Sequence, residues 1–150
     1  EAKNKKLVMP DPILLSSGCV GPTVRTYAGD KLPKSEVAVI KGWHAFYIFG
    51  YTTVDIFSID ASETLKATKV EVLPGRHRLT IRVYKPGLGY IPKTLHYLPV
   101  ALNAEAGHEY KISLRSVGLG GYDYRVDIID VNTGAIIFSE HLSSNTNHSY

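Results

Sequence analysis

The sequence is poor in residues that hold small domains together by covalent bonds or metal ions. Its 150 residues include one cysteine, Cys19, one methionine and one tryptophan. A lone cysteine excludes an internal disulfide and any site built from several thiolates, so Cys19 must be free, modified or paired with another chain. The fold therefore has to depend on a hydrophobic core. A chain of this length suits one domain that buries roughly two thirds of its unfolded surface.

Long apolar runs and clusters of like charge are also missing. No stretch approaches the roughly 20 apolar residues of a membrane-spanning helix. The net charge is only +3, and the 17 basic residues are scattered, with the densest group at Lys3, Lys5 and Lys6. A stripe of basic residues that could follow phosphates is absent, so we expect no nucleic-acid partner.

Motifs for catalysis, metals and cofactors are absent as well. The histidines lack the close spacing of metal ligands and have no second cysteine to join them. No nucleophile elbow of the form Gly-x-Ser-x-Gly occurs. Asp127 and Asp130 flank an apolar pair near a turn, where solvation or turn capping explains them. We therefore predict a protein that is not an enzyme, with no metal and no cofactor. The histidines are His44, His77, His96, His108, His141 and His148.

The clearest pattern that is present is an alternation of apolar and polar residues over Lys69–Tyr84, KVEVLPGRHRLTIRVY. Val70 and Val72 alternate with charged residues, and a second alternating run follows a Pro-Gly turn. This period of two predicts a β-hairpin with one apolar face. Because that face must be covered, the hairpin requires a second sheet and therefore a sandwich or a barrel.

Similar short runs fill the chain from Glu36 onward, and none indicates a long helix. Turn signals recur about every ten residues, including Asn132-Thr133-Gly134, where glycine can adopt a positive φ angle. We predict an all-β fold, a single antiparallel β-sandwich of six to eight short strands at residues 36–140, followed by a polar tail at 141–150. Besides the central hairpin, the expected strands are 36–41, 53–60, 94–103, 109–115, 122–131 and 135–140.

Residues 1–35 form a different zone, rich in proline, which we expect to be an extended N-terminal arm. The chain begins with Glu rather than Met, which suggests a processed or truncated start. Lys5-Lys6, an apolar stretch to Ser17 and then Gly18-Cys19 are typical of a bacterial lipoprotein signal, although Asp11 interrupts the apolar part. Cys19 is therefore a lipidation candidate. The alternative is an ordered arm whose apolar segment LVMPDPILL adds as a strand to the sheet edge of a neighbouring subunit.

Two glycine-rich loops are flanked by tyrosines. Tyr84 and Tyr90 surround one loop, and Tyr122 and Tyr124 follow the other. Tyrosine offers a large contact area and a polar tip at low entropic cost, so these four residues are candidates for binding. Packing of the same rings across strands is the alternative.

Several of these segments resemble known proteins. Val54–Asp60, Val70–Val83 and Asn103–Leu114 resemble the PEGA-type β-sandwich repeats, of immunoglobulin-like form, found in bacterial envelope proteins. Residues 19–137 are also similar to a group of uncharacterised small bacterial envelope lipoproteins. In this sequence Ala61 stands where a glycine usually follows the Ile-Asp pair. The resemblance implies a location in the cell envelope (periplasm, outer membrane or cell exterior) and no catalytic residues.

Together these features predict a non-catalytic envelope protein, a structural or assembly module that acts through strand edges and loops. Its expected partners are proteins, including identical subunits joined by strand addition. A membrane, to which the protein would be anchored through Cys19, is also expected. One alternative is a subunit of an extracellular filament joined by its N-terminal arm. Another is a carbohydrate-binding or peptidoglycan-binding module that uses the tyrosine loops.

Overall fold

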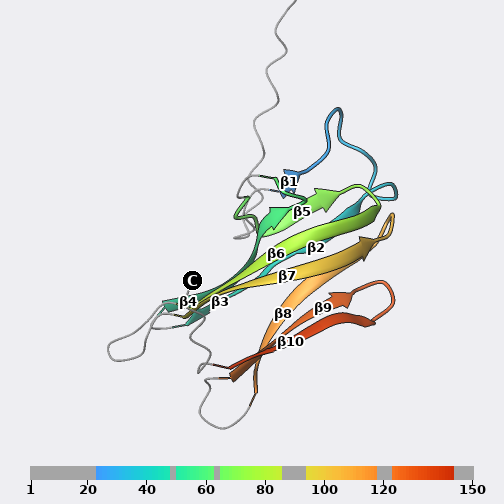
Figure 1. Cartoon of the computed structure of the whole chain (residues 1–150). Helices are drawn as coiled ribbons and strands as arrows, with labels where there is room; N and C mark the ends of the chain where they lie inside the picture. The colour runs from blue at the N-terminus through green and yellow to red at the C-terminus, as the bar shows by residue number, and fades with distance from the viewer. Residues whose placement is uncertain (1–22, 48–49, 63–64, 86–93, 118–122, 144–150) are drawn as a thin grey trace, which may run out of the picture.

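The computed structural model describes residues 23–47, 50–62, 65–85, 94–117 and 123–143. Within these residues it contains ten strands and no helix, so the all-β prediction is confirmed (Figure 1). Accordingly, the described part of the chain offers no helix suited to crossing a membrane. The strands are β1 (Thr23–Arg25), β2 (Ala38–Lys41), β3 (Trp43–Tyr47), β4 (Gly50–Ile59), β5 (Lys69–Val72), β6 (Gly75–Lys85), β7 (Thr94–Ala104), β8 (Glu109–Val117), β9 (Asp123–Asp130) and β10 (Ile136–Leu142).

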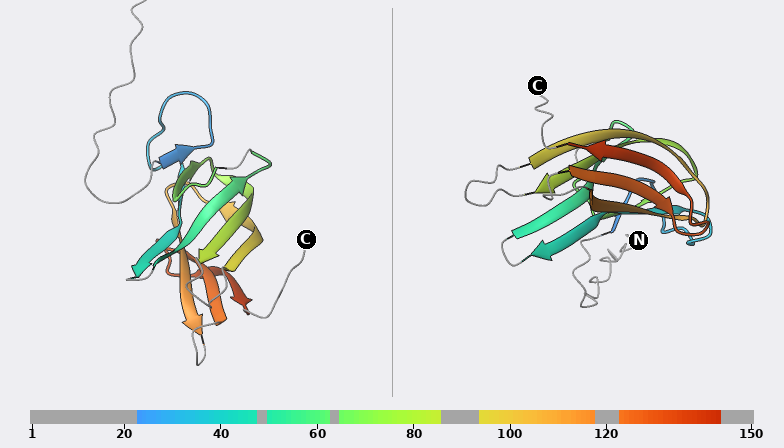
Figure 2. Two further views of the ribbon diagram at one scale, coloured as in Figure 1. Left: turned by 90° about the vertical axis from the view of Figure 1, so that its left-hand side faces the viewer. Right: turned by 90° about the horizontal axis from the view of Figure 1, so that it is seen from below.

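The strands form two sheets that pack face to face, which confirms the predicted sandwich. One sheet has the order β1-β5-β2-β8-β9-β10 and the other β3-β4-β6-β7. Both are curved and twisted (Figure 2). The structure differs from expectation in having ten strands and in two parallel pairs, β1 with β5 and β2 with β8. Alternation in sequence reports which side of a strand is buried, but not the direction of its neighbour, so it could not reveal these pairs.

The core lies between the sheets and is built from alternate residues of the longer strands. Leu79, Ile81 and Val83 of β6 point inward and are almost fully buried, as are Ile112 of β8 and Ile128 of β9. Burial of each such side chain contributes about 1.5 to 3 kcal/mol relative to exposure. The apolar half of each alternating run thus supplies the main stabilisation of the fold.

The predicted hairpin at Lys69–Tyr84 is wrong. β5 pairs with β2 and β1 in the six-stranded sheet, whereas β6 pairs with β4 and β7 in the other. The turn that includes Pro74 and Gly75 therefore carries the chain from one sheet to the other. Gly75 has a φ angle of 132°, which favours glycine. Two strands that each have one apolar face look the same in sequence whether they pair side by side or face each other.

A second crossing, from β2 to β3, needs glycine for steric reasons. At Gly42 a Cβ atom would lie 2.3 Å from the carbonyl oxygen of Val54, and the Gly42 N–H donates to the Thr68 carbonyl oxygen at 2.7 Å. Backbone therefore approaches backbone closely at this point, and a larger residue would force them apart. This crossing places Trp43, the next residue, at the start of the four-stranded sheet.

The last predicted hairpin is confirmed. β9 and β10 are antiparallel neighbours, and Gly134 in their connection has a φ angle of 76°. The Asp130 side chain accepts hydrogen bonds from the N–H groups of Asn132 and Thr133, as expected for a turn-capping residue. β10 runs to Leu142, slightly into the predicted tail.

Part of the predicted arm is joined to the sandwich. β1 pairs in parallel with β5, and the Tyr27 hydroxyl donates to Glu71 Oε2 at 3.1 Å. The predicted lipidation residue Cys19 lies outside the described residues. So does the apolar segment at residues 7–15, on which the strand-addition hypothesis depends.

Candidate functional site

The sandwich has two ends that differ in chemistry. At the end we call the polar end, short turns connect β5 to β6, β7 to β8 and β9 to β10, and charged side chains gather around them. At the other end, which we call the open end, the chain leaves Tyr47, Lys85 and Val117 for the connections at 48–49, 86–93 and 118–122.

At the polar end, Asp130 is buried and fully engaged. Its carboxylate accepts a hydrogen bond from His108 Nδ1 at 2.8 Å in addition to those from the turn. Burial raises the pKa of Asp130, but the hydrogen bonds from His108 and from the Asn132 amide outweigh it and lower the pKa below its usual value of 3.8. The carboxylate therefore stays ionised and holds two turns together.

A second carboxylate of the polar end, Asp60, is held in the same way. Its Oδ1 accepts the Arg78 N–H at 2.8 Å and its Oδ2 lies 2.5 Å from His77 Nδ1, while His77 Nε2 lies 2.7 Å from the Leu73 carbonyl oxygen. Desolvation raises the pKa of Asp60, and the bonds from Arg78 and His77 more than compensate and lower it. Ala61, the next residue, has a φ angle of 58°.

The third tightly held carboxylate, Asp127, lies on the outer face of the six-stranded sheet. It is 1% exposed, so the expectation that solvation explains this residue is wrong. Ser139 donates to it at 2.6 Å and Arg115 at 2.7 Å. Burial raises its pKa, but these two hydrogen bonds bring the pKa below the usual value. These bonds tie β8, β9 and β10 together across the sheet.

All of these groups have structural partners, and none converges on an unoccupied space. In the ranges that the structure describes, no three His, Cys, Asp or Glu residues are grouped so that they could hold a metal ion. The polar end therefore acts as a set of ties between turns.

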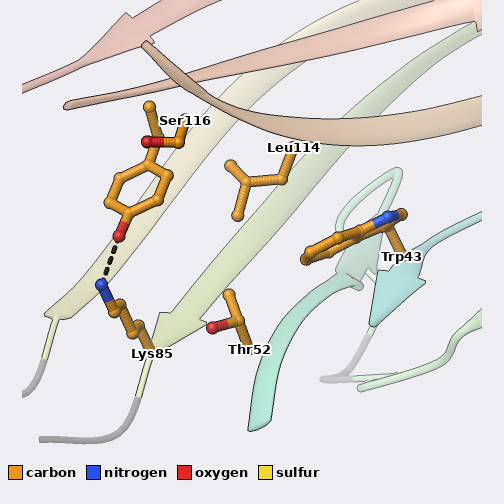
Figure 3. Close-up of a pocket in the computed structure, with 6 residues that line it drawn as sticks. Trp43, Thr52, Lys85, Leu114 and Ser116 are labelled. Atoms are coloured by element: carbon orange, nitrogen blue, oxygen red, sulfur yellow. Dashed lines mark hydrogen bonds between the residues drawn. The ribbon is translucent and has the colours of Figure 1, made fainter. Parts of the chain in front are cut away.

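The open end contains a cavity between the two sheets, with a volume of about 320 Å³ (Figure 3). One wall comes from the four-stranded sheet and the other from β8 and β9. Lys85 and its hydrogen-bond partner lie on the side of the cavity away from Trp43, and Leu114 and Thr52 lie between them (Figure 3). The lining residues are Trp43, Thr52, Lys85, Leu114, Ser116 and Tyr124.

Lys85 gives this cavity its charge. Its Nζ donates a hydrogen bond to the Tyr124 hydroxyl and lies 4.9 Å from the centroid of the Tyr124 ring. Among the residues that the structure describes, no carboxylate forms an ion pair with Lys85. A half-buried ammonium group thus faces the cavity with a neutral phenol as its partner.

The four predicted tyrosines do not form one surface. Tyr124 lines the cavity, whereas Tyr84 follows inward-facing Val83 on β6 and therefore points to the outer face of its sheet. Tyr90 and Tyr122 lie outside the described residues. Of the candidates that can be placed, only Tyr124 is part of a cavity.

Sequence reasoning missed the rest of the cavity, although a signal was present. Lys85 continues the inward series of Leu79, Ile81 and Val83, and Leu114 and Ser116 continue the inward series of β8. A lysine at an inward position near a strand end indicates a charge directed between the sheets. Trp43 carried no comparable signal, because its placement depends on the crossing at Gly42.

A second hollow runs between the free edges of the two sheets, along β7 and β10. It has a volume of about 300 Å³, and Ile137 and Phe138 of β10 form one side. Ile136 and Ile137 are 58% and 45% exposed. β10 is the last strand of its sheet, so one row of its backbone N–H and C=O groups has no neighbouring strand in the described part of the chain. We call this hollow and the free side of β10 the β10 edge.

Comparison of the chain with models of protein families, with curated proteins and with solved structures gave no match in any of the three. The resemblance to PEGA-type repeats and to envelope lipoproteins therefore stays a prediction.

Proposed function

We propose that the protein is a non-catalytic structural module of the bacterial cell envelope that assembles with copies of itself by strand addition at the β10 edge. The single observation that carries this proposal is the pair of exposed isoleucines on an edge strand, beside a hollow between the two sheets. Natural sheets usually protect such edges with charge, proline or a covering segment. An edge left apolar is suited to receive an extended segment through backbone hydrogen bonds.

The other edges are less suitable for pairing. β7 carries Pro99, which has no N–H to donate, near the middle of the strand. β1 and β3, the remaining edge strands, are only three and five residues long. β10 has seven residues and a bulge near its start, at Ile137 between Ile136 and Phe138, which leaves its later residues regularly paired with β9. These differences favour β10 as the edge that receives another chain.

The proposed donor is the apolar segment at residues 7–15 of a second copy, and Cys19 is the proposed lipid attachment site. Two sequence features support these roles: the apolar composition of LVMPDPILL and the small residues before the cysteine. If the segment is instead removed as part of a signal, it cannot act as the donor strand. In that case only the proposed lipid attachment at Cys19 remains, and the copies need another donor. The two roles therefore predict different mature chains.

Self-association of the full chain tests the assembly. Sedimentation velocity is expected to show oligomers whose dissociation constant rises at least about tenfold in Ile137→Lys, a loss of about 1.4 kcal/mol. Leu73→Lys is the matched control, because Leu73 is a comparably exposed residue in the turn between β5 and β6. Its association is expected to be unchanged. A wild-type chain that stays monomeric to about 1 mM, the concentration of a very weak complex, overturns the proposal.

Mass spectrometry of the protein from native membranes tests the anchor separately. A diacylglycerol adduct on Cys19 supports it. A mature chain that begins at Glu1 and carries an unmodified Cys19 would exclude the lipid anchor. It would also mean that the proposed donor segment is retained in the mature protein.

A further inference from the structure

We propose that the cavity at the open end binds a small organic monocarboxylate with a flat apolar body. The carboxylate would lie on Lys85 and Tyr124, and the body between Trp43 and Leu114 (Figure 3). This site is separate from the β10 edge and does not depend on the proposed assembly.

The charge of Lys85 favours an anionic ligand. The Lys85 ammonium is half-buried and bonded to a phenol. Removing a charge from water without an opposite charge costs free energy, which a bound anion would offset. The connections nearest to this end, residues 48–49, 86–93 and 118–122, read IF, PGLGYIPK and GLGGY and contain no acidic residue. Those connections cannot supply a carboxylate of the protein itself.

The rest of the lining favours a ligand with an apolar body. Trp43 and Leu114 offer an aromatic and an aliphatic wall, and Thr52 and Ser116 add two hydroxyl groups. A volume of about 320 Å³ lies at the small end of the range for ligand sites. An apolar lining with a few polar groups is the usual composition of such sites. The body of the ligand is therefore small and apolar, with one polar end.

The number of cationic groups favours a carboxylate over a phosphate. Phosphate sites commonly combine several cationic groups or a row of backbone N–H donors. Among the described residues that line the cavity, Lys85 is the only charged one. One ammonium with one phenolic hydroxyl matches a single negative charge, which is what a monocarboxylate provides.

The chain offers a direct measurement, because Trp43 is its only tryptophan. Titration of the full chain with 3-phenylpropionate is expected to change tryptophan fluorescence in a saturable way below about 10 mM, a range that detects weak binding. The neutral analogue 3-phenylpropanamide is expected to bind at least about tenfold more weakly, because it lacks the charge that pairs with the ammonium group. Inorganic phosphate at equal ionic strength is expected not to displace the bound acid.

Variants locate the site. Lys85→Met is expected to weaken binding of the acid at least about tenfold and to abolish the preference over the amide. Lys111→Met is the control, because Lys111 is an exposed lysine on the other face of β8. If Lys85→Met does not fold, Lys85→Arg, which keeps the charge, is expected to retain the preference. Equal binding of acid and amide, displacement by phosphate, an unaffected Lys85→Met or the absence of saturable binding would each overturn the proposal.

Discussion

At the polar end of the sandwich, Asp130 accepts hydrogen bonds from His108 and from two turn amides, and Asp60 is held between His77 and Arg78. At the open end, Lys85 donates a hydrogen bond to a neutral phenol, that of Tyr124, and faces a cavity. Both ends contain partly buried charge. The difference lies in the partners of the charged groups. At the polar end the carboxylates accept hydrogen bonds that hold turns together, whereas at the open end the Lys85 ammonium group faces the cavity.

This contrast separates structural charge from charge that is available for binding. A buried carboxylate with several donors stabilises the fold and has little capacity for another ligand. A half-buried ammonium without a counter-ion adds little to stability and is free to pair with an anion. Three experiments can break or sharpen the contrast.

Acid is expected to have the largest effect, because it acts on several structural carboxylates at once. The pKa values of Asp60, Asp127 and Asp130 are lowered in the folded protein. Their contribution to stability is therefore complete above the unfolded-state pKa, about 3.9, and is lost as the pH falls through the lower folded-state values. Urea unfolding between neutral pH and pH ~2 should show a steep decline in the free energy of unfolding below about pH 4.

The Asp130→Asn variant should show a shallower decline over the same pH range, because one of the titrating groups is gone. At acidic pH the Asn132 and Thr133 amides, which donate to Asp130, should exchange hydrogen before the amides of the central strands. A flat profile to low pH would contradict the role assigned to the polar end.

The second experiment compares one charged residue from each end. Asp130→Ala should reduce the free energy of unfolding by about 2 to 3 kcal/mol, because His108 and two turn N–H groups lose their acceptor. Lys85→Met should change it by less than about 0.5 kcal/mol, the size usual for substitutions outside the core and outside buried hydrogen-bond networks. Chemical denaturation of both variants provides the measurement. Equal losses would mean that Lys85 also has a structural role.

The smallest expected effect concerns the hydroxyl of Tyr110, a buried residue of β8. This hydroxyl accepts the Glu105 N–H at 2.9 Å and thereby fixes the turn from β7 to β8. Tyr110→Phe should cost about 1 kcal/mol, the value of one hydrogen bond. Tyr27→Phe should cost less, because Tyr27 is only half-buried and its hydroxyl donates to buried Glu71 over a longer distance, 3.1 Å. A larger loss from Tyr27→Phe would show that the β1 connection is the more important tie.

Two turns illustrate how far local sequence could predict the fold. Asn132-Thr133-Gly134 was predicted to close a hairpin and does so, with Gly134 at positive φ. The turn after β5 contains an equally clear Pro-Gly signal, yet it connects strands in different sheets. A turn residue reports the local backbone angle, whereas the choice between pairing and facing depends on contacts with strands far away in the sequence.

The candidate sites show the same division. Tyr124 was recognised from its position after a glycine loop, but Lys85, its partner, lies 39 residues earlier and was not connected with it. Ile136 and Ile137 read as part of an ordinary strand, and only the sheet order reveals that this strand is an edge. Sequence patterns identify which side of a strand is apolar, but they do not identify which strands lack a neighbour.

The sequence by itself determined an all-β chain with a dry interior, because alternation of period two requires one covered face on each strand. It also determined that covalent cross-links play no part within the chain, since a single cysteine cannot form one. The tertiary structure alone decided the exchange of strands between sheets, the two parallel pairs and the meeting of Trp43, Lys85 and Tyr124 around one cavity. These features arise from contacts between segments that are distant along the chain. Local propensity depends only on neighbouring residues and therefore does not predict such contacts.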